Sequence, residues 1–184
     1  MAAMAEPTRK TSDVAERARQ TAFVLYQGKL TPHRSCGIAL AETFGLPSAA
    51  YQALRRGGIT GEGECGAYKA GELVIGQILG DPDPTGAVTP QLRAAMQHYQ
   101  AAARTELVLG AQDTTRRSEA AARSLPLANV GWNIQCNALT APHGDFMGED
   151  RRTFCTVLAS DVARLVAAAL ESVGHTPNVT DTPR

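Results

Sequence analysis

Neither sign of charge is in excess in this 184-residue chain, since 18 lysine and arginine residues balance 18 aspartate and glutamate residues. Nucleic acids and anionic membrane surfaces both select proteins with a surplus of basic side chains. Neither is therefore expected as a partner. The arginine pairs 55–56, 116–117 and 151–152 are scattered, and solvated helix faces explain them better than a binding patch does.

Signals for membrane insertion, secretion and strands are also lacking. No apolar run approaches the roughly 20 residues that cross a bilayer, so no membrane span is predicted. Residues 1–11 are polar and do not resemble a secretory signal, which makes the cytoplasm the expected location. Apolar and polar residues do not alternate as they do in strands. In a reducing compartment, metal, cluster or redox chemistry is a more frequent use of four cysteines than structural disulfides.

The sequence does contain a series of helical patterns. Apolar residues at three- and four-residue steps predict helices that end near Gly28, Gly45 and Gly174. Thr89 followed by Pro90 predicts the start of another helix. We therefore expect an all-α, single-domain irregular bundle of about six helices over residues 12–174. Residues 1–11 and 175–184 are expected to be disordered tails, and the charged stretch 112–124 has no functional interpretation.

A glycine-rich loop, GGITGEGECGA at residues 57–67, leads into the predicted central helix. Glycine lets a backbone approach another group closely, so Gly61, Gly63 and Gly66 are predicted to contact a cofactor. Cys65 lies where this helix begins. The helix dipole and the free N–H groups there favour a thiolate, and Cys65 is expected to ionise readily.

The four cysteines, Cys36, Cys65, Cys136 and Cys155, are dispersed and form no C-x-x-C pair. Each alone reads as a small buried hydrophobe. As a set they suggest more, because Cys36 and Cys65 open helices and Cys155 lies near the start of the last one. Four thiolates gathered at helix starts would suit an iron–sulfur cluster, whose negative charge the helix N-termini offset.

Other side chains near the cysteines have both structural and chemical interpretations. Trp132, shortly before Cys136, is either a core residue or a shield that keeps water from a cofactor. Glu62 and Glu64 are either solvated loop charges or acid–base groups beside Cys65. His33 and His143 are candidate ligands, although surface or capping roles are more common for lone histidines.

The order of these features resembles the family of redox-active cysteine proteins named after its pattern C_GCAxxG_C_C. The matching residues are Cys36 within SCGIA (35–39), Cys65 within GECGA (63–67), and then Cys136 and Cys155. The similarity spans about residues 30–170, and Ala70 stands where the family usually has glycine. The resemblance implies redox activity. It also supports cluster binding, because a similar cysteine arrangement occurs in a cytochrome domain that holds an iron–sulfur cluster.

Three functions follow as hypotheses. The first is a redox protein that binds an iron–sulfur cluster through the four cysteines, for electron transfer, redox-linked catalysis or sensing, with an unidentified redox partner protein. The second is a thiol–disulfide oxidoreductase in which Cys65 attacks and Cys36 resolves. The third is a helical module that binds a partner protein or holds a structural zinc ion with the same four ligands. Whether the chain acts alone or as a homo-oligomer stays open.

Overall fold

Helices form the framework of the chain. The computed structural model describes residues 12–83, 85–107 and 133–183. The helices are α1 (Asp13–Gln27), α2 (Cys36–Thr43), the 3-10 helix η1 (Ala49–Leu54), α3 (Gly66–Leu79), α4 (Pro90–Ala102), the π-helical turn η2 (Ala103–Leu107), α6 (Cys136–Thr140), the 3-10 turn η4 (Ala141–His143) and α7 (Glu149–Ser172). These described ranges contain no strand, only one isolated bridge between Glu64 and Gln135. The predicted all-α irregular bundle is confirmed.

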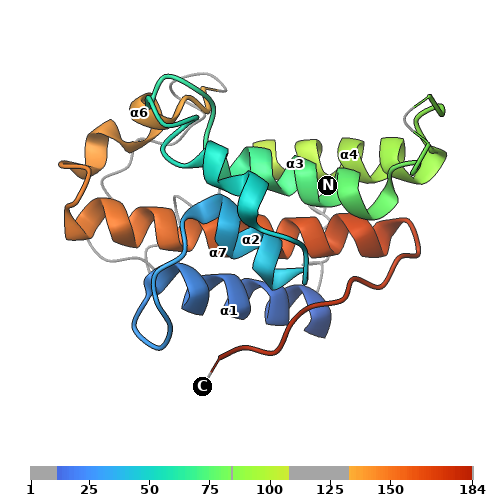
Figure 1. Cartoon of the computed structure of the whole chain (residues 1–184), viewed down its shortest axis with the longest axis horizontal. Coiled ribbons are helices and arrows are strands. Elements are labelled where there is room, and N and C mark those ends of the chain that lie inside the picture. The colour runs from blue at the N-terminus through green and yellow to red at the C-terminus, as the bar shows by residue number, and fades with distance from the viewer. Residues whose placement is uncertain (1–11, 84, 108–132, 184) are drawn as a thin grey trace, which may run out of the picture.

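Helix α7 is the axis of the bundle, and α1, α2, α3 and α4 all pack against it (Figure 1). Helix α1 contributes three fully buried alanines, Ala15, Ala18 and Ala22. Small side chains let two helices approach closely, and the buried face of α7 likewise alternates alanines with valines and leucines. The helix is therefore apolar on most of its circumference, as a helix enclosed by neighbours must be.

This composition makes α7 long and apolar enough to cross a membrane by length and composition alone. The sequence-based statement that no segment approaches that length is therefore wrong. However, 67% of the apolar 18-residue stretch of this helix is buried inside the bundle. A central helix with neighbours on several sides accounts for the same apolar run, so the finding is weak support for a membrane span.

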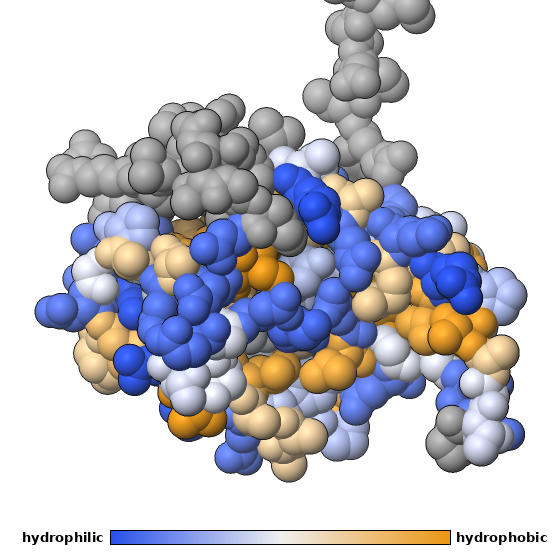
Figure 2. Space-filling model, turned by 90° about the horizontal axis from the view of Figure 1, so that it is seen from above, coloured by the Kyte–Doolittle hydropathy of each residue, from blue (hydrophilic) through white to orange (hydrophobic). Residues whose placement is uncertain are grey.

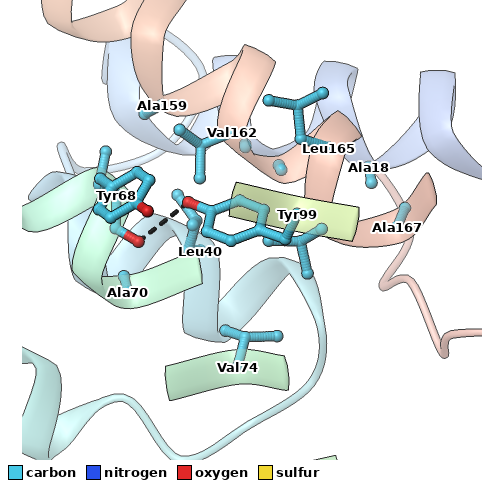
Figure 3. Packing of buried hydrophobic residues seen from close by; sticks show 14 of the residues in the cluster. Ala18, Leu40, Tyr68, Ala70, Val74, Tyr99, Ala159, Val162, Leu165 and Ala167 are labelled. Carbon is cyan, nitrogen blue, oxygen red and sulfur yellow. Dashed lines mark hydrogen bonds between the residues drawn. The ribbon is translucent and has the colours of Figure 1, made fainter. Parts of the chain in front are cut away.

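A pair of tyrosines joins α3, α4 and the core (Figure 3). The rings of Tyr68 and Tyr99 stack with centroids 5.4 Å apart, and the Tyr99 hydroxyl donates to the Tyr68 carbonyl oxygen at 2.9 Å. A Cβ on Gly71 would collide with that hydroxyl. A buried hydroxyl without a partner would be costly, so the glycine gives Tyr99 the space in which its hydrogen bond can form.

The C-terminal segment is fixed to the bundle, which corrects the prediction that residues 175–184 form a disordered tail. The Thr180 N–H donates to the Thr43 carbonyl at 2.9 Å, and the hydroxyls of Thr21 and Thr182 lie 2.8 Å apart. Val179 is buried. These contacts hold residues 175–183 against α1 and α2, as the trace in Figure 1 shows.

Three sequence-based predictions concern residues outside the described ranges. They are the tail at residues 1–11, the charged stretch 112–124, and Trp132. Each stays a prediction.

Candidate functional site

The four cysteines come from four different helices and surround one end of the core. Cys36 is the first residue of α2, Cys65 is the N-cap of α3, Cys136 is the first residue of α6, and Cys155 lies on α7. Cys36, Cys136 and Cys155 line a single cavity of about 440 Å³. A charge on Cys65 raises the pKa of both Cys36 and Cys155, which indicates that Cys65 lies next to them.

The sequence predicted that Cys36 and Cys65 would open helices, that Cys155 would lie near the start of the last helix, and that Cys136 would follow irregular structure. The structure agrees for Cys36, Cys65 and Cys155, which lies in the second turn of α7, and it adds a further helix start at Cys136. All four cysteines are free thiols. The Cys36 sulfur lies 3.0 Å from the position that a Cβ on Gly66 would occupy, which places it beside the first turn of α3.

Backbone pairing between the glycine-rich loop and residues 134–137 positions Cys65 and Cys136. The Cys65 N–H donates to the Ile134 carbonyl at 2.6 Å, and the Cys136 N–H donates to the Gly63 carbonyl at 2.9 Å. The Asn137 N–H donates to Gly61 at 3.0 Å. These hydrogen bonds hold residues 61–65 against residues 134–137, and so hold Cys65 and Cys136 in place.

The glycines of this loop make the pairing sterically possible. A Cβ on Gly57, whose φ is +58°, would come within 2.6 Å of the Cys136 Cβ, and one on Gly63 within 2.7 Å of the Gly57 carbonyl oxygen. A Cβ on Gly61 would overlap the Asn137 side chain, and one on Gly66 would overlap the Leu54 carbonyl. None of Gly61, Gly63 and Gly66 lines the cavity. The close packing of the protein on itself accounts for these glycines, and their contact with a cofactor stays a prediction.

Burial, rather than the helix dipole, decides the protonation of the thiols. Burial raises the pKa of Cys65 to about 11, against the N–H groups of Tyr68 and Ala67, which favour the thiolate. Burial, with a further contribution from the neighbouring thiols, raises the pKa of Cys155 to about 12. The pKa of Cys36 is raised well above its usual range for the same reasons. The expectation that Cys65 ionises readily is wrong, because loss of hydration outweighs the N–H groups at the helix start.

Positive charge lines the same cavity. Arg55, Arg56, Arg151 and Arg152 all reach it, whereas none of the residues lining it is acidic. Arg151 is only 9% exposed, and its guanidinium donates toward the Cys136 sulfur at 4.0 Å. It also lowers the pKa of Cys155. The sequence interpretation of the arginine pairs as scattered is wrong for 55–56 and 151–152, which the fold brings together. Arg55, Arg56 and Arg152 are exposed, as that interpretation expected, and the pair 116–117 lies outside the described residues.

The acidic loop residues have structural partners. Glu62 accepts hydrogen bonds from Gln135 at 3.1 Å and Asn137 at 3.4 Å, which reinforces the pairing of the two segments. Glu64 forms an exposed ion pair with Lys69 at 3.2 Å. These contacts favour the structural interpretation of both carboxylates over acid–base chemistry beside Cys65.

The two candidate histidines differ in their surroundings. His33 lines the cavity, but its Nδ1 is hydrogen-bonded to the Tyr26 carbonyl, which leaves Nε2 as the nitrogen able to bind anything there. His143 is buried, and its ring stacks on Phe154 with centroids 4.1 Å apart. His143 is thus part of the core, which corrects its interpretation as a surface or capping histidine.

Across the described part of the chain, no three side chains among histidine, cysteine, aspartate and glutamate are grouped as ligands of a single metal ion. No protein-family model, no curated protein and no solved structure matches the chain. The resemblance to the C_GCAxxG_C_C family therefore depends on its motif residues alone. What sequence reasoning missed is the basic cavity and the pairing of the glycine loop with residues 134–137, neither of which has a local sequence signal.

Proposed function

We propose that this chain is a redox protein whose four cysteines, Cys36, Cys65, Cys136 and Cys155, hold an iron–sulfur cluster. The observation that carries the proposal is that Cys36, Cys136 and Cys155, from three helices, line one cavity. Cys65 lies close enough for a charge on it to raise the pKa of both Cys36 and Cys155. Dispersed cysteines that served only as apolar filler would have no reason to collect at one end of the core. When bound, such a cluster supplies one-electron transfer at a potential that charge and hydrogen bonds around the sulfurs tune.

The surroundings of the sulfurs suit an anionic group. N–H groups of Gly37, Ala67 and Tyr68 favour the thiolate forms of Cys36 and Cys65. The buried guanidinium of Arg151 lies toward Cys136 and favours the thiolate of Cys155. In the metal-free chain the raised pKa values of Cys36, Cys65 and Cys155 keep these three thiols protonated. Metal binding has to release those protons and should strengthen as the pH rises.

The spacing of the cysteines bears on the choice between a cluster and zinc. A single zinc ion bonds sulfur at about 2.3 Å and requires its ligands to surround one point. No such group occurs among the residues that the structure describes. In a cluster the four cysteines are shared among two or more irons, so all four sulfurs need not converge on one atom. The absence of a single-ion group among the described residues therefore weighs more against zinc than against a cluster.

The decisive experiment is metal and sulfide analysis of protein prepared and reconstituted without oxygen. We expect a brown protein with iron and acid-labile sulfide, and loss of the colour in each single Cys→Ser variant. His33→Ala is the matched control, because His33 lines the cavity but is not one of the proposed ligands, and it should keep its iron. A colourless, iron-free protein after reconstitution would refute the proposal. Zinc in place of iron would favour the third hypothesis.

Thiol–disulfide chemistry is the second candidate, because the Cys36 sulfur lies against Gly66, beside Cys65. The raised pKa of both thiols disfavours it, since the thiolate is the attacking species. Mass spectrometry of the oxidised protein distinguishes the two. A Cys36–Cys65 bridge that forms readily at pH 7 and does not require Cys136 would favour exchange chemistry. A cytoplasmic location and a redox partner protein are further parts of the proposal.

A further inference from the structure

Four arginines line the cavity, but only one of them approaches a cysteine sulfur. Arg151 is the one that approaches sulfur. The side chains of Arg55, Arg56 and Arg152 form no hydrogen bond or ion pair with any side chain of the described ranges, although all three line the cavity. Like charges held together without a carboxylate repel one another. A bound anion would relieve that repulsion.

Buried polar groups at the cavity point to the same ligand chemistry. Arg151 is 9% exposed and has a thiol and an aromatic ring as neighbours, but no carboxylate among the residues that the structure describes pairs with it. Buried charges are normally paired. The Ser35 hydroxyl, also at the cavity, is buried and has no hydrogen-bond partner there. A guanidinium and a hydroxyl together are the groups that recognise carboxylates and phosphates.

The mouth of the cavity is apolar as well as basic. Ile59, Phe146 and Met147 line it and are 61%, 50% and 74% exposed. The guanidiniums of Arg56 and Arg151 lie 4.7 Å and 4.9 Å from the centroid of the Phe146 ring. Such contacts hold both cations in place over the ring. Figure 2 shows that one face of the molecule mixes apolar patches with hydrophilic side chains.

Backbone strain marks the same edge. Ile59 has φ +76° and Arg56 has φ +49°, both in the left-handed region. A β-branched residue there is a true outlier, and strain of this kind concentrates at ligand sites because the surrounding structure must enforce it. Here it presents an isoleucine side chain to solvent at the cavity, which core packing does not explain.

We infer that this cavity binds a small organic anion, a carboxylate or a phosphate ester, with its charged group against Arg56, Arg151 and Ser35 and its apolar part against Phe146 and Ile59. The volume of about 440 Å³ lies within the range of about 300–1,000 Å³ that is typical of small-molecule sites. The inference concerns the arginine-lined side of the cavity that Cys36, Cys136 and Cys155 also line. It is argued from Arg56, Arg151, Ser35 and Phe146 rather than from a bound cluster.

Isothermal titration calorimetry of the full chain, both metal-free and reconstituted, with benzoate, phenyl phosphate, inorganic phosphate and benzyl alcohol tests this inference. We expect saturable binding of both aromatic anions, weaker binding of inorganic phosphate, and none of the neutral alcohol. Affinity should fall with salt. The stronger of the two aromatic anions identifies the preferred charged group.

Variants locate the site. Arg151→Gln should weaken binding of the aromatic anions at least about tenfold, because it leaves the bound anion without its most buried partner. Arg56→Gln, at an exposed position, should weaken it severalfold and guards against a folding defect in the first variant. Arg93→Gln on α4 is the matched control, since Arg93 is exposed and does not line the cavity. Phe146→Ala should weaken aromatic anions more than inorganic phosphate.

Absence of saturable binding to either form of the protein up to about 10 mM, a concentration at which even millimolar affinities are visible, would overturn the inference. Equal binding of benzyl alcohol and benzoate, or binding unchanged in Arg56→Gln and Arg151→Gln, would also overturn it. Binding to the metal-free form alone would show that the arginines serve the cluster itself. The iron content of Arg56→Gln keeps the two proposals separate, because it should equal that of the parent protein.

Discussion

The two ends of α7 pass through different kinds of surroundings. From Leu158 to Leu170 the helix is enclosed by apolar side chains of α1, α3 and α4. From Arg151 to Cys155 it meets a basic cavity, free thiols and a loop with several residues at positive φ. The first region is held by side-chain packing. The second is held by backbone contacts that glycine permits.

The two regions therefore differ in which substitutions they tolerate. Packing tolerates exchange among apolar residues of similar volume. A glycine whose Cβ would overlap a backbone carbonyl tolerates no exchange at all, as Gly66 illustrates against Leu54. The packed region should therefore determine the stability of the protein, and the cysteine end should determine which groups meet at the cavity. Substitutions in each region test this division.

The largest effect on stability is expected from Leu165→Ala. Leu165 is 1% exposed in the packed region, and truncating a buried leucine costs about 2–5 kcal/mol of the free energy of unfolding. Denaturant titration measures the loss. Leu73→Ala on α3 is the matched control, because Leu73 is 47% exposed, and it should change stability by less than about 0.5 kcal/mol. The folded fraction of Leu165→Ala should bind as much iron as the parent, and a selective loss of iron would break the division.

Gly66→Ala should produce the opposite pattern. The added methyl group would overlap the Leu54 carbonyl and press on the Cys36 sulfur, and such overpacking costs about 1–3 kcal/mol. Because the displaced atoms include a proposed ligand, iron incorporation should fall more than stability does. Gly76→Ala in the same helix meets nothing within 4 Å and should be neutral or stabilising by up to about 1 kcal/mol. Equal effects of the two alanines would show that the close approach at Gly66 is unimportant.

The same division explains how far the sequence could be interpreted. Helices such as α1 and α7 were predictable because their apolar residues recur at helical spacing, and Gly28 ends α1 with φ +73°. The gathering of the cysteines was inferred only from their positions at helix starts. The pairing of Gly63 with Cys136 and the meeting of the two arginine pairs depend on contacts between distant segments. No local pattern encodes such contacts.

The electrostatic error at Cys65 has a similar origin. A helix start was correctly inferred, and the N–H groups there do favour the thiolate. The depth of burial, however, is a property of the assembled core, and burial controls the pKa. The ordered C-terminal segment was missed for a related reason, since Thr180 is held by hydrogen bonds to Thr43 on another helix rather than by its own sequence.

A change in the pH dependence of stability is expected at the cysteine end. The folded pKa of Cys65 is about 11, whereas an unfolded thiol titrates near about 8.5. Between these values the folded chain holds a proton that the unfolded chain has lost. The contribution of the protonated thiol is therefore fully present below about pH 8.5 and declines by about 1.4 kcal/mol per pH unit as the pH rises toward 11.

Urea titrations of the metal-free protein from about pH 8 to pH 10 should show this decline together with those of Cys36 and Cys155, whose pKa values are also raised. Cys65→Ala should make the slope shallower by about 1.4 kcal/mol per pH unit, while Leu165→Ala leaves it unchanged. Comparing slopes rather than absolute stabilities removes the cost of each substitution. An identical slope in Cys65→Ala would mean that this thiol is hydrated rather than buried. In reconstituted protein the decline should be weaker, because metal binding removes the thiol protons before unfolding. A thiol that keeps its full alkaline dependence after reconstitution is not a ligand.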